Sequence, residues 1–116
     1  MSELVLDASA LVLAVGSRAD RVAGLRDRLT ASGCHAPHLI DADVAATALA
    51  GGRLLVDERY PHTGSLARAA WELRDTITFY DALYAALAAT LGVPLLTADA
   101  RLTRAPGLPC QVELVA

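Results

Sequence analysis

The sequence contains no lysine, since all ten of its basic side chains are arginine. This absence excludes a Schiff-base mechanism and a phosphate-binding loop that ends in lysine. It also removes the lysine that completes the phospho-acceptor site of a receiver domain. A small receiver-like signalling domain shares the size and fold class of this chain. Without that lysine it is only a weak alternative.

Cysteine and long apolar runs are also scarce. Cys34 and Cys110 are too few for a disulfide scaffold, so we expect both to be reduced thiols packed in the core. The uncharged stretches fall short of the roughly 20 apolar residues that a membrane-spanning helix requires. The first residues lack the basic and apolar regions of a secretory signal. We therefore expect a cytoplasmic protein with no membrane association.

Most of the sequence is aliphatic: hydrophobic residues make up 54% of the chain and aromatic residues only 4%. This composition predicts a core of closely packed small and aliphatic side chains. The length of 116 residues predicts a single domain over residues 1–116. Aspartate outnumbers glutamate nine to four, which suggests helix caps, turns or ligands for a hard metal ion. The net charge of -3 neither indicates nor excludes nucleic-acid binding.

Short apolar runs alternate with helical patterns along the chain. The predicted strands cover residues 4–6, 34–37, 95–97 and 111–115. The first predicted helix follows Asp7. The other predicted helices cover residues 18–32 with Gly33 as C-cap, 41–49, 65–73 with Ser65 as N-cap, 81–91 before Gly92, and 99–104 as a helix or turn. Residues 53–64 are predicted to be irregular. Strands that alternate with helices predict an α/β fold of three layers, in which helices flank a central, mostly parallel sheet.

Aspartates occupy one kind of position in this pattern. Asp7 and Asp99 each follow a predicted strand, and Asp81 begins a nearly all-apolar helix. Ligands of open α/β sheets bind beyond the carboxyl ends of the strands, so we expect these side chains to lie near one another. Taken singly, each is more simply explained as a helix N-cap. Several carboxylates at one sheet edge repel each other unless a divalent cation such as Mg²⁺ or Mn²⁺ neutralises them.

A fourth carboxylate belongs to the helix predicted over residues 41–49. Asp41 and Asp43 lie on opposite flanks of its apolar stripe, and their spacing does not choose between them. Either one is also explained as a solvated carboxylate on a helix.

Four stretches of the sequence carry a family resemblance. They are Val5–Ala10, Ala36–Leu39 with the Asp43-Val44 pair that follows, Tyr80–Ala88, and Pro94–Leu102. The YDALYAALA and TADARL segments are specific, whereas DASA alone is modest evidence. In order and spacing the four stretches resemble the PIN-domain ribonucleases, specifically the VapC toxins of bacterial type II toxin–antitoxin modules, over nearly the whole chain.

The resemblance implies a PIN-like fold and an Mg²⁺- or Mn²⁺-dependent endoribonuclease that hydrolyses structured RNA such as tRNA or rRNA. It also implies a homodimer and a cognate VapB-type antitoxin that inhibits the enzyme. The residues that it nominates to hold the metal and cut RNA are Asp7, Asp43, Asp81 and Asp99. It nominates the hydroxyls of Ser9 and Thr97 to orient these carboxylates or a metal-bound water.

Two departures from the family pattern lead to a second hypothesis. The residue before Val44 is usually Glu and is Asp43 here, whose carboxylate is one methylene shorter. The middle of the chain, around residues 51–65, is shorter than in most members and lacks much of a helical pair. The alternative is therefore a degenerate PIN domain that acts as a binding or dimerisation module without nuclease activity.

Other side chains are assigned to packing or to the surface. The predicted helix over residues 18–32 has a basic outer face that either meets water or pairs with RNA phosphates. We expect Trp71 to pack in the core rather than stack on bases. The histidines lie outside the matching motifs and are expected to pack in loops or at strand ends: His35, His38 and His62.

Overall fold

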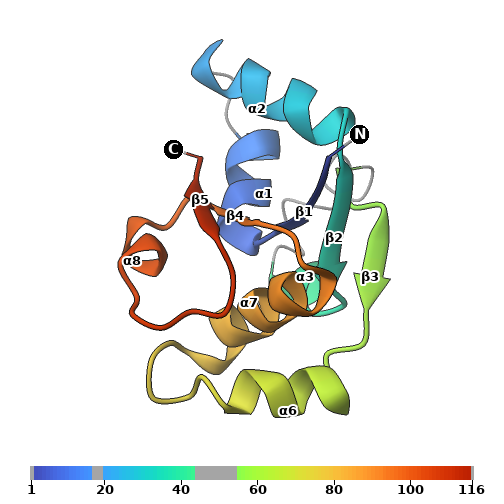
Figure 1. The fold of residues 1–116 in the computed structure, drawn as a ribbon. Helices are drawn as coiled ribbons and strands as arrows, with labels where there is room; N and C mark the ends of the chain where they lie inside the picture. The colour runs from blue at the N-terminus through green and yellow to red at the C-terminus, as the bar shows by residue number, and fades with distance from the viewer. Residues whose placement is uncertain (1, 17–19, 44–54, 116) are drawn as a thin grey trace.

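A sheet of five strands forms the centre of the molecule (Figure 1). The computed structural model describes residues 2–16, 20–43 and 55–115. The strands are β1 (Glu3–Leu6), β2 (Gly33–Pro37), β3 (Glu58–Tyr60), β4 (Leu95–Thr97) and β5 (Val112–Leu114). Their order is β3-β2-β1-β4-β5, and every neighbouring pair is parallel. The predicted sheet is confirmed, and among the described strands it is parallel throughout.

Helices cover both faces of this sheet. They are α1 (Ala8–Gly16), α2 (Asp20–Thr30), α3 (Ile40–Asp43), α6 (Ser65–Trp71), α7 (Phe79–Leu91) and α8 (Ala100–Thr103). Figure 1 shows α1 and α2 on one side of the sheet and α6 and α7 on the other. The prediction of an α/β fold in three layers is confirmed. Within the described ranges, none of the helices has the length and apolar character needed to cross a membrane.

The buried residues form one aliphatic core around the two central strands. Leu4, Val5 and Leu6 of β1 are at most 1% exposed, and all of β4 is buried. Helix α7 packs against β1, β2 and β4 and is buried without interruption from Ala82 to Ala88. Its alanines allow the helix to approach the sheet closely, so the first turn of α7 is held at a defined place above the sheet edge.

Both ends of α7 have specific caps. At the start, the Thr78 hydroxyl accepts the backbone N–H of Asp81 at 3.3 Å. Asp81 is therefore the third residue of α7 and does not cap it, because Thr78 already fills that position. At the end, Gly92 adopts the left-handed conformation with a φ of 67°, which confirms the predicted glycine stop.

Replacing Gly92 with alanine is expected to lower the free energy of unfolding by about 1–2 kcal/mol, because an L-residue is strained in the left-handed region. No neighbouring atom lies within 4 Å of the position of the new Cβ, so the effect is conformational. Gly24→Ala in α2 is the matched control, because its surroundings are equally open and its φ is not positive. That variant should gain roughly 0.5–1 kcal/mol. Urea unfolding measures both, and changes of the same sign would contradict the argument.

The segment predicted to be irregular contains the edge strand β3, so that prediction is wrong for residues 58–60. Its residues pair with 35–37 of β2. The strand lies at the sheet edge without a fully buried face, and apolar alternation therefore does not reveal it. Polar contacts hold it instead. The Asp57 carboxylate accepts the backbone N–H of Cys34 at 2.8 Å, and the Tyr60 hydroxyl lies 2.9 Å from Nδ1 of His35.

Two predicted helix caps are corrected. The backbone N–H of Gly33 donates to the carbonyl of Ser2 at 2.8 Å, so Gly33 opens β2 and does not cap α2. Helix α6 has Gly64 at its N-cap, with a φ of 63° and no side-chain cap, and Ser65 is its first helical residue. Residues 44–49 of the helix predicted over 41–49 lie outside the described residues. So does residue 18, and the described part of its helix begins at Asp20. The shortened middle segment stays a prediction.

Trp71 is 57% exposed, which contradicts its predicted place in the core. Helix α6 buries Leu66 and Ala70, and Trp71 comes at its last position. The guanidinium of Arg74 lies over the indole ring, 4.9 Å from the ring centroid. The ring therefore supports an arginine at the surface.

Candidate active site

The carboxyl ends of β1 and β4 meet at the point where the strand order reverses. From β1 the sheet extends through β2 to β3 on one side and through β4 to β5 on the other. Asp7 follows β1 directly, and Asp99 comes two residues after β4. Asp81 lies in the first turn of α7. Such a switch point is where open α/β sheets bind ligands, because the loops diverge there and leave a crevice.

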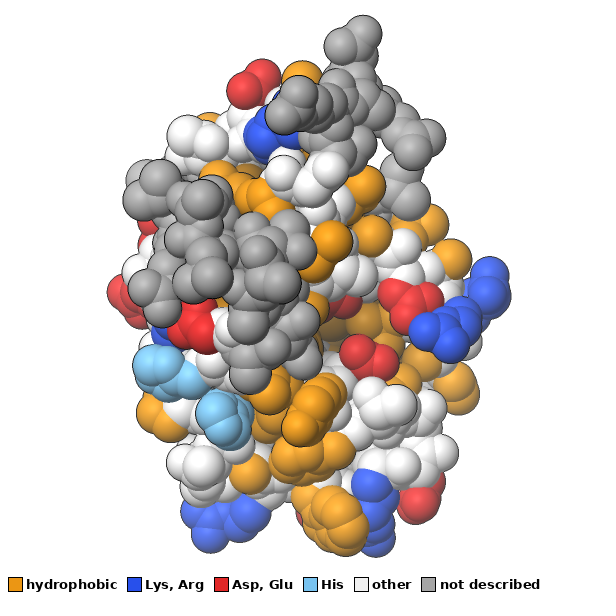
Figure 2. All heavy atoms as spheres, turned by 180° about the vertical axis from the view of Figure 1, so that it is seen from behind, with side chains coloured by type: hydrophobic (Ala, Val, Ile, Leu, Met, Phe, Trp, Pro, Cys, Tyr) orange, Lys and Arg blue, Asp and Glu red, His pale blue; other side chains and the backbone are white. Residues whose placement is uncertain are grey.

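These three carboxylates line one cavity of about 300 Å³, together with Ala8, Ser9, Tyr80 and Tyr84. Figure 2 shows acidic side chains around a hollow in the middle of this face, with hydrophobic side chains below it. The structure thus brings Asp7, Asp81 and Asp99 together from three separate segments of the chain. The backbone of Asp43 belongs to α3, and its side chain lies outside the described part of the structure.

Asp7 is almost completely buried, with 4% of its surface exposed. Its Oδ1 accepts the hydroxyl of Ser9 at 2.7 Å and the backbone N–H of Ala10 at 2.9 Å, so it also caps α1. Burial raises the pKa of Asp7 above its ordinary value, and the nearby charge of Asp81 raises it further. Hydrogen bonds from Thr97, Ala10 and Ser9 oppose this rise. Asp7 is therefore both an N-cap and a cavity carboxylate.

Two hydroxyls connect the loops that follow β1 and β4. Ser9 Oγ lies 3.1 Å from Thr97 Oγ1 and accepts the backbone N–H of Ala98 at 2.9 Å. Thr97 Oγ1 accepts the backbone N–H of Asp99 at 3.0 Å, and Thr97 is completely buried. Ser9 and Thr97 therefore position Asp7 and Asp99 relative to each other.

Thr97→Val is expected to lower the free energy of unfolding by about 1–3 kcal/mol, because it leaves the partly buried N–H of Asp99 without its acceptor. Thr97→Ser keeps the hydroxyl and should lose less, only the contribution of one buried methyl. Chemical denaturation of the two variants measures the difference. A valine variant as stable as the serine variant would show that the hydroxyl does not hold the loop.

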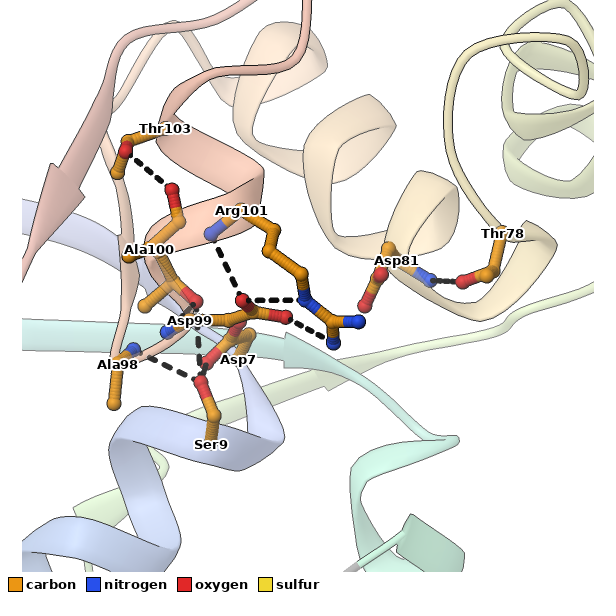
Figure 3. Close-up of polar contacts among 10 residues, drawn as sticks. Asp7, Ser9, Thr78, Asp81, Ala98, Asp99, Ala100, Arg101 and Thr103 are labelled. Carbon is orange, nitrogen blue, oxygen red and sulfur yellow. Dashed lines mark hydrogen bonds and ion pairs between the residues drawn. The ribbon is translucent and has the colours of Figure 1, made fainter.

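Asp99 is engaged by Arg101 through both carboxylate oxygens. Nε and Nη2 of Arg101 donate to Oδ1 and Oδ2 at 3.1 and 3.0 Å, and the backbone N–H of Arg101 donates to Oδ1 at 2.9 Å. These hydrogen bonds hold the pKa of Asp99 below its ordinary value. Figure 3 shows the Arg101 guanidinium directed from Asp99 toward Asp81, and the charge of Asp81 contributes to the raised pKa of Arg101. Arg101 therefore acts as a cation between two cavity carboxylates.

Several other candidates do not join the cavity. Asp41 pairs with Arg59 of β3 at 3.0 Å, so the structure makes it part of an ion pair. His35 packs against Tyr60 as expected of a non-catalytic histidine, but it lies inside β2 and not at a strand end, and none of the described histidines lines the cavity. Cys34 is buried and Cys110 partly buried, and both are free thiols as expected. Burial raises the pKa of Cys34 to about 11, which makes it an unreactive thiol.

The contact between Arg101 and Asp99 was not predicted from the sequence. Its signal is the position two residues after an N-cap aspartate, from which an arginine can fold back on that carboxylate. Among the described residues, no three Asp, Glu, His or Cys side chains already stand close enough together to hold a metal ion. The donor set suits a hard cation, because the cavity carries three carboxylates and no described thiol or imidazole.

A family model matches this chain. The model described as PIN domain matches residues 39–108, which is more than half of the sequence and includes Asp81 and Asp99. Ribonuclease VapC1 of Mycobacterium tuberculosis (strain ATCC 25618 / H37Rv) is 45% identical over 132 aligned positions, covering 99% of each chain. The chain therefore belongs to the PIN-domain family and, within it, to the VapC ribonucleases.

Solved structures have the same fold. DNA-bound VapBC from Salmonella typhimurium gives a TM-score of 0.70 at 14% identity, with both chains covered completely. VapBC-5 of Mycobacterium tuberculosis, a member of the VapBC family of toxin–antitoxin systems, gives 0.52 at 20% identity, covering 98% of this chain and 99% of its own. At these identities the likeness supports the fold alone.

Proposed function

We propose that this chain is a metal-dependent endoribonuclease toxin that hydrolyses structured RNA such as tRNA or rRNA. The observation that carries the proposal is the convergence of Asp7, Asp81 and Asp99 on one cavity at the switch point of the sheet. Membership of the VapC ribonucleases supports RNA as the substrate.

Asp7, Asp81 and Asp99 would hold an Mg²⁺ or Mn²⁺ ion, with Asp43 as the predicted fourth ligand. A divalent ion supplies activation of water at neutral pH and stabilisation of the negative charge that develops on the phosphate. The hydroxyl of Ser9 donates to Oδ1 of Asp7 and so limits rotation of that carboxylate. The hydroxyl of Thr97 accepts the backbone N–H of Asp99 and so limits movement of the backbone there. The two hydroxyls are therefore positioning groups for the proposed ligands.

The proposal includes a cognate VapB-type antitoxin, a homodimer and a cytoplasmic location. Support for protein partners comes from the VapBC complexes that share the fold. Three large hydrophobic side chains are also exposed on α6 and α7, namely Trp71, Phe79 and Tyr80. Exposed apolar surface of this kind is typical of protein contacts. RNA substrates of a bacterial toxin lie in the cytoplasm.

A degenerate PIN domain without nuclease activity is the second candidate. The observation that favours it is the pairing of Asp99 with Arg101, which engages both oxygens of a proposed metal ligand. Titration calorimetry with Mn²⁺ separates the two candidates, because the binding module would take up no metal at millimolar concentrations.

The direct test is cleavage of tRNA and rRNA by the purified protein with Mg²⁺ or Mn²⁺, compared with the Asp7→Asn variant. Cleavage by the wild type that is lost in the variant supports the proposal. Equal activity in the two proteins would overturn it.

A further inference from the structure

A second, larger cavity of about 550 Å³ opens beside the carboxylate cavity and shares Asp81 and Asp99 with it. One wall is the segment from Arg74 to Thr78, between α6 and α7. The other wall is α8 with the turn that follows it. Both walls contribute basic side chains, and we call this cavity the arginine groove after Arg74, Arg101 and Arg104.

The three arginines are engaged to different degrees. Arg101 is bound to Asp99 through both carboxylate oxygens. Arg74 donates to the carbonyl of Trp71 at 3.1 Å and lies over the ring of Trp71, which holds its guanidinium in place. The Arg104 side chain makes no hydrogen bond or ion pair with any residue of the described ranges, and it is exposed. Arg104 is therefore the arginine of the groove that is available to an external anion.

Charge explains why such a groove is needed beside an acidic site. The carboxylates of Asp7, Asp81 and Asp99 repel a polyanion unless nearby cations offset them. The groove lining has three arginines and three aspartates, Asp75, Asp81 and Asp99, whereas the carboxylate cavity has three aspartates and no arginine. The groove therefore offsets its own carboxylates, and the charge of Arg104 is near enough to Asp99 to help lower the pKa of that carboxyl.

Two arginines of the basic face predicted for α2, Arg26 and Arg28, are engaged elsewhere. On α2, Arg26 donates to the carbonyl of Ala14 at 3.0 Å, and Arg28 pairs with Glu113. The described residues of α2 line neither cavity.

We propose that the arginine groove binds the RNA strand beside the bond that is cut, and that Arg104 contacts the phosphate next to the scissile one. This inference rests on the proposed ribonuclease function and adds the path of the substrate to it. Arg74, held by Trp71, forms the opposite wall and limits the strand to one track. Recognition through phosphates is independent of sequence, so the groove contributes affinity and register.

Fluorescence anisotropy with a labelled single-stranded RNA of mixed sequence tests the proposal. The binding is measured in an Asp7→Asn background, which stops cleavage, over a series of salt concentrations. Adding Arg104→Ala should weaken binding several-fold at low salt and reduce the slope of log affinity against log salt by about 0.7, the value for one phosphate contact to a single strand. Arg104→Lys, which keeps the charge, should recover most of the slope.

The matched control is Arg68→Ala, because Arg68 is exposed on α6 and lines neither cavity. It should leave affinity and slope unchanged. If Arg104→Ala behaves like Arg68→Ala while the wild type still cleaves RNA, the groove assignment fails and the ribonuclease proposal stands. If the wild type neither binds nor cleaves RNA, both fail.

Discussion

The Asp7→Asn variant is expected to cleave RNA about 10³-fold more slowly than the wild type. Removing one carboxylate from the proposed metal site forfeits several kcal/mol of transition-state stabilisation, and each 1.36 kcal/mol is tenfold in rate. The fold should survive, because asparagine keeps an oxygen that accepts the backbone N–H of Ala10 and is as good an N-cap as aspartate. Single-turnover cleavage of RNA with saturating Mn²⁺ measures the loss.

Asp27→Asn is the control for this experiment. Asp27 is an exposed carboxylate on α2 and lines neither cavity, so its removal changes the net charge by the same amount without touching the site. Its cleavage rate should equal that of the wild type. A similar loss in both variants would mean that net charge, and not the cavity, determines the rate.

Asp7→Asn should also raise the Tm of the metal-free protein at neutral pH. Burial, with a smaller contribution from Asp81, raises the pKa of Asp7, so folding favours its protonated form. The stability that this carboxyl contributes is complete below its unfolded pKa of about 3.9 and is lost as the pH rises through its folded pKa. At pH 7 burial therefore makes the ionised form of Asp7 unfavourable, and asparagine removes this cost. The gain in Tm should shrink as the pH falls toward the unfolded value.

A lower Tm for Asp7→Asn at neutral pH would contradict this argument. It would show that the charged hydrogen bonds from Ser9 and Ala10 outweigh the cost of burying the carboxylate. The sign of the change therefore decides whether Asp7 is mainly a cap or mainly a strained member of an acidic cavity.

Saturation with Mn²⁺ is expected to raise the Tm of the wild type by roughly 10 °C. A hundredfold excess over Kd adds about 2.7 kcal/mol, and each kcal/mol moves the Tm by about 4 °C in a domain of this size. Differential scanning calorimetry with increasing Mn²⁺ measures the shift. The wild type without Mn²⁺ gives the reference Tm. The wild type with Ca²⁺ gives the Tm with another divalent ion for comparison.

Variants locate the ion. Asp81→Asn should lose most of the shift, whereas Asp75→Asn, an exposed carboxylate of the neighbouring groove, should keep it. Arg101→Ala should bind Mn²⁺ more tightly, because it releases both oxygens of Asp99 and removes a competing cation. A wild type that shows no shift at millimolar Mn²⁺ would refute the metal site and favour the binding module.

Much of the fold could be predicted from local patterns. The strands at residues 4–6 and 95–97 are short apolar runs buried on both faces, and α7 is an apolar run with a glycine stop. The edge strand β3 could not be found in this way, because polar contacts of Asp57 and Tyr60 hold it. Trp71 was misplaced for a similar reason, since hydrophobicity predicts burial but not which face of a short helix meets the core.

The chain alone was enough to place Asp7 and Asp99 beyond the ends of buried strands, since each follows a short apolar run directly or within two residues. It also supplied the motifs that point to the VapC ribonucleases. Folding decided the rest. The adjacency of β1 and β4 puts the two aspartates at one crevice, and the packing of α7 adds Asp81. Asp41 pairs with Arg59 and does not line the cavity, and Arg101 folds back on Asp99, two residues before it. These outcomes depend on contacts between residues far apart in the chain or on side-chain direction, which local periodicity does not encode.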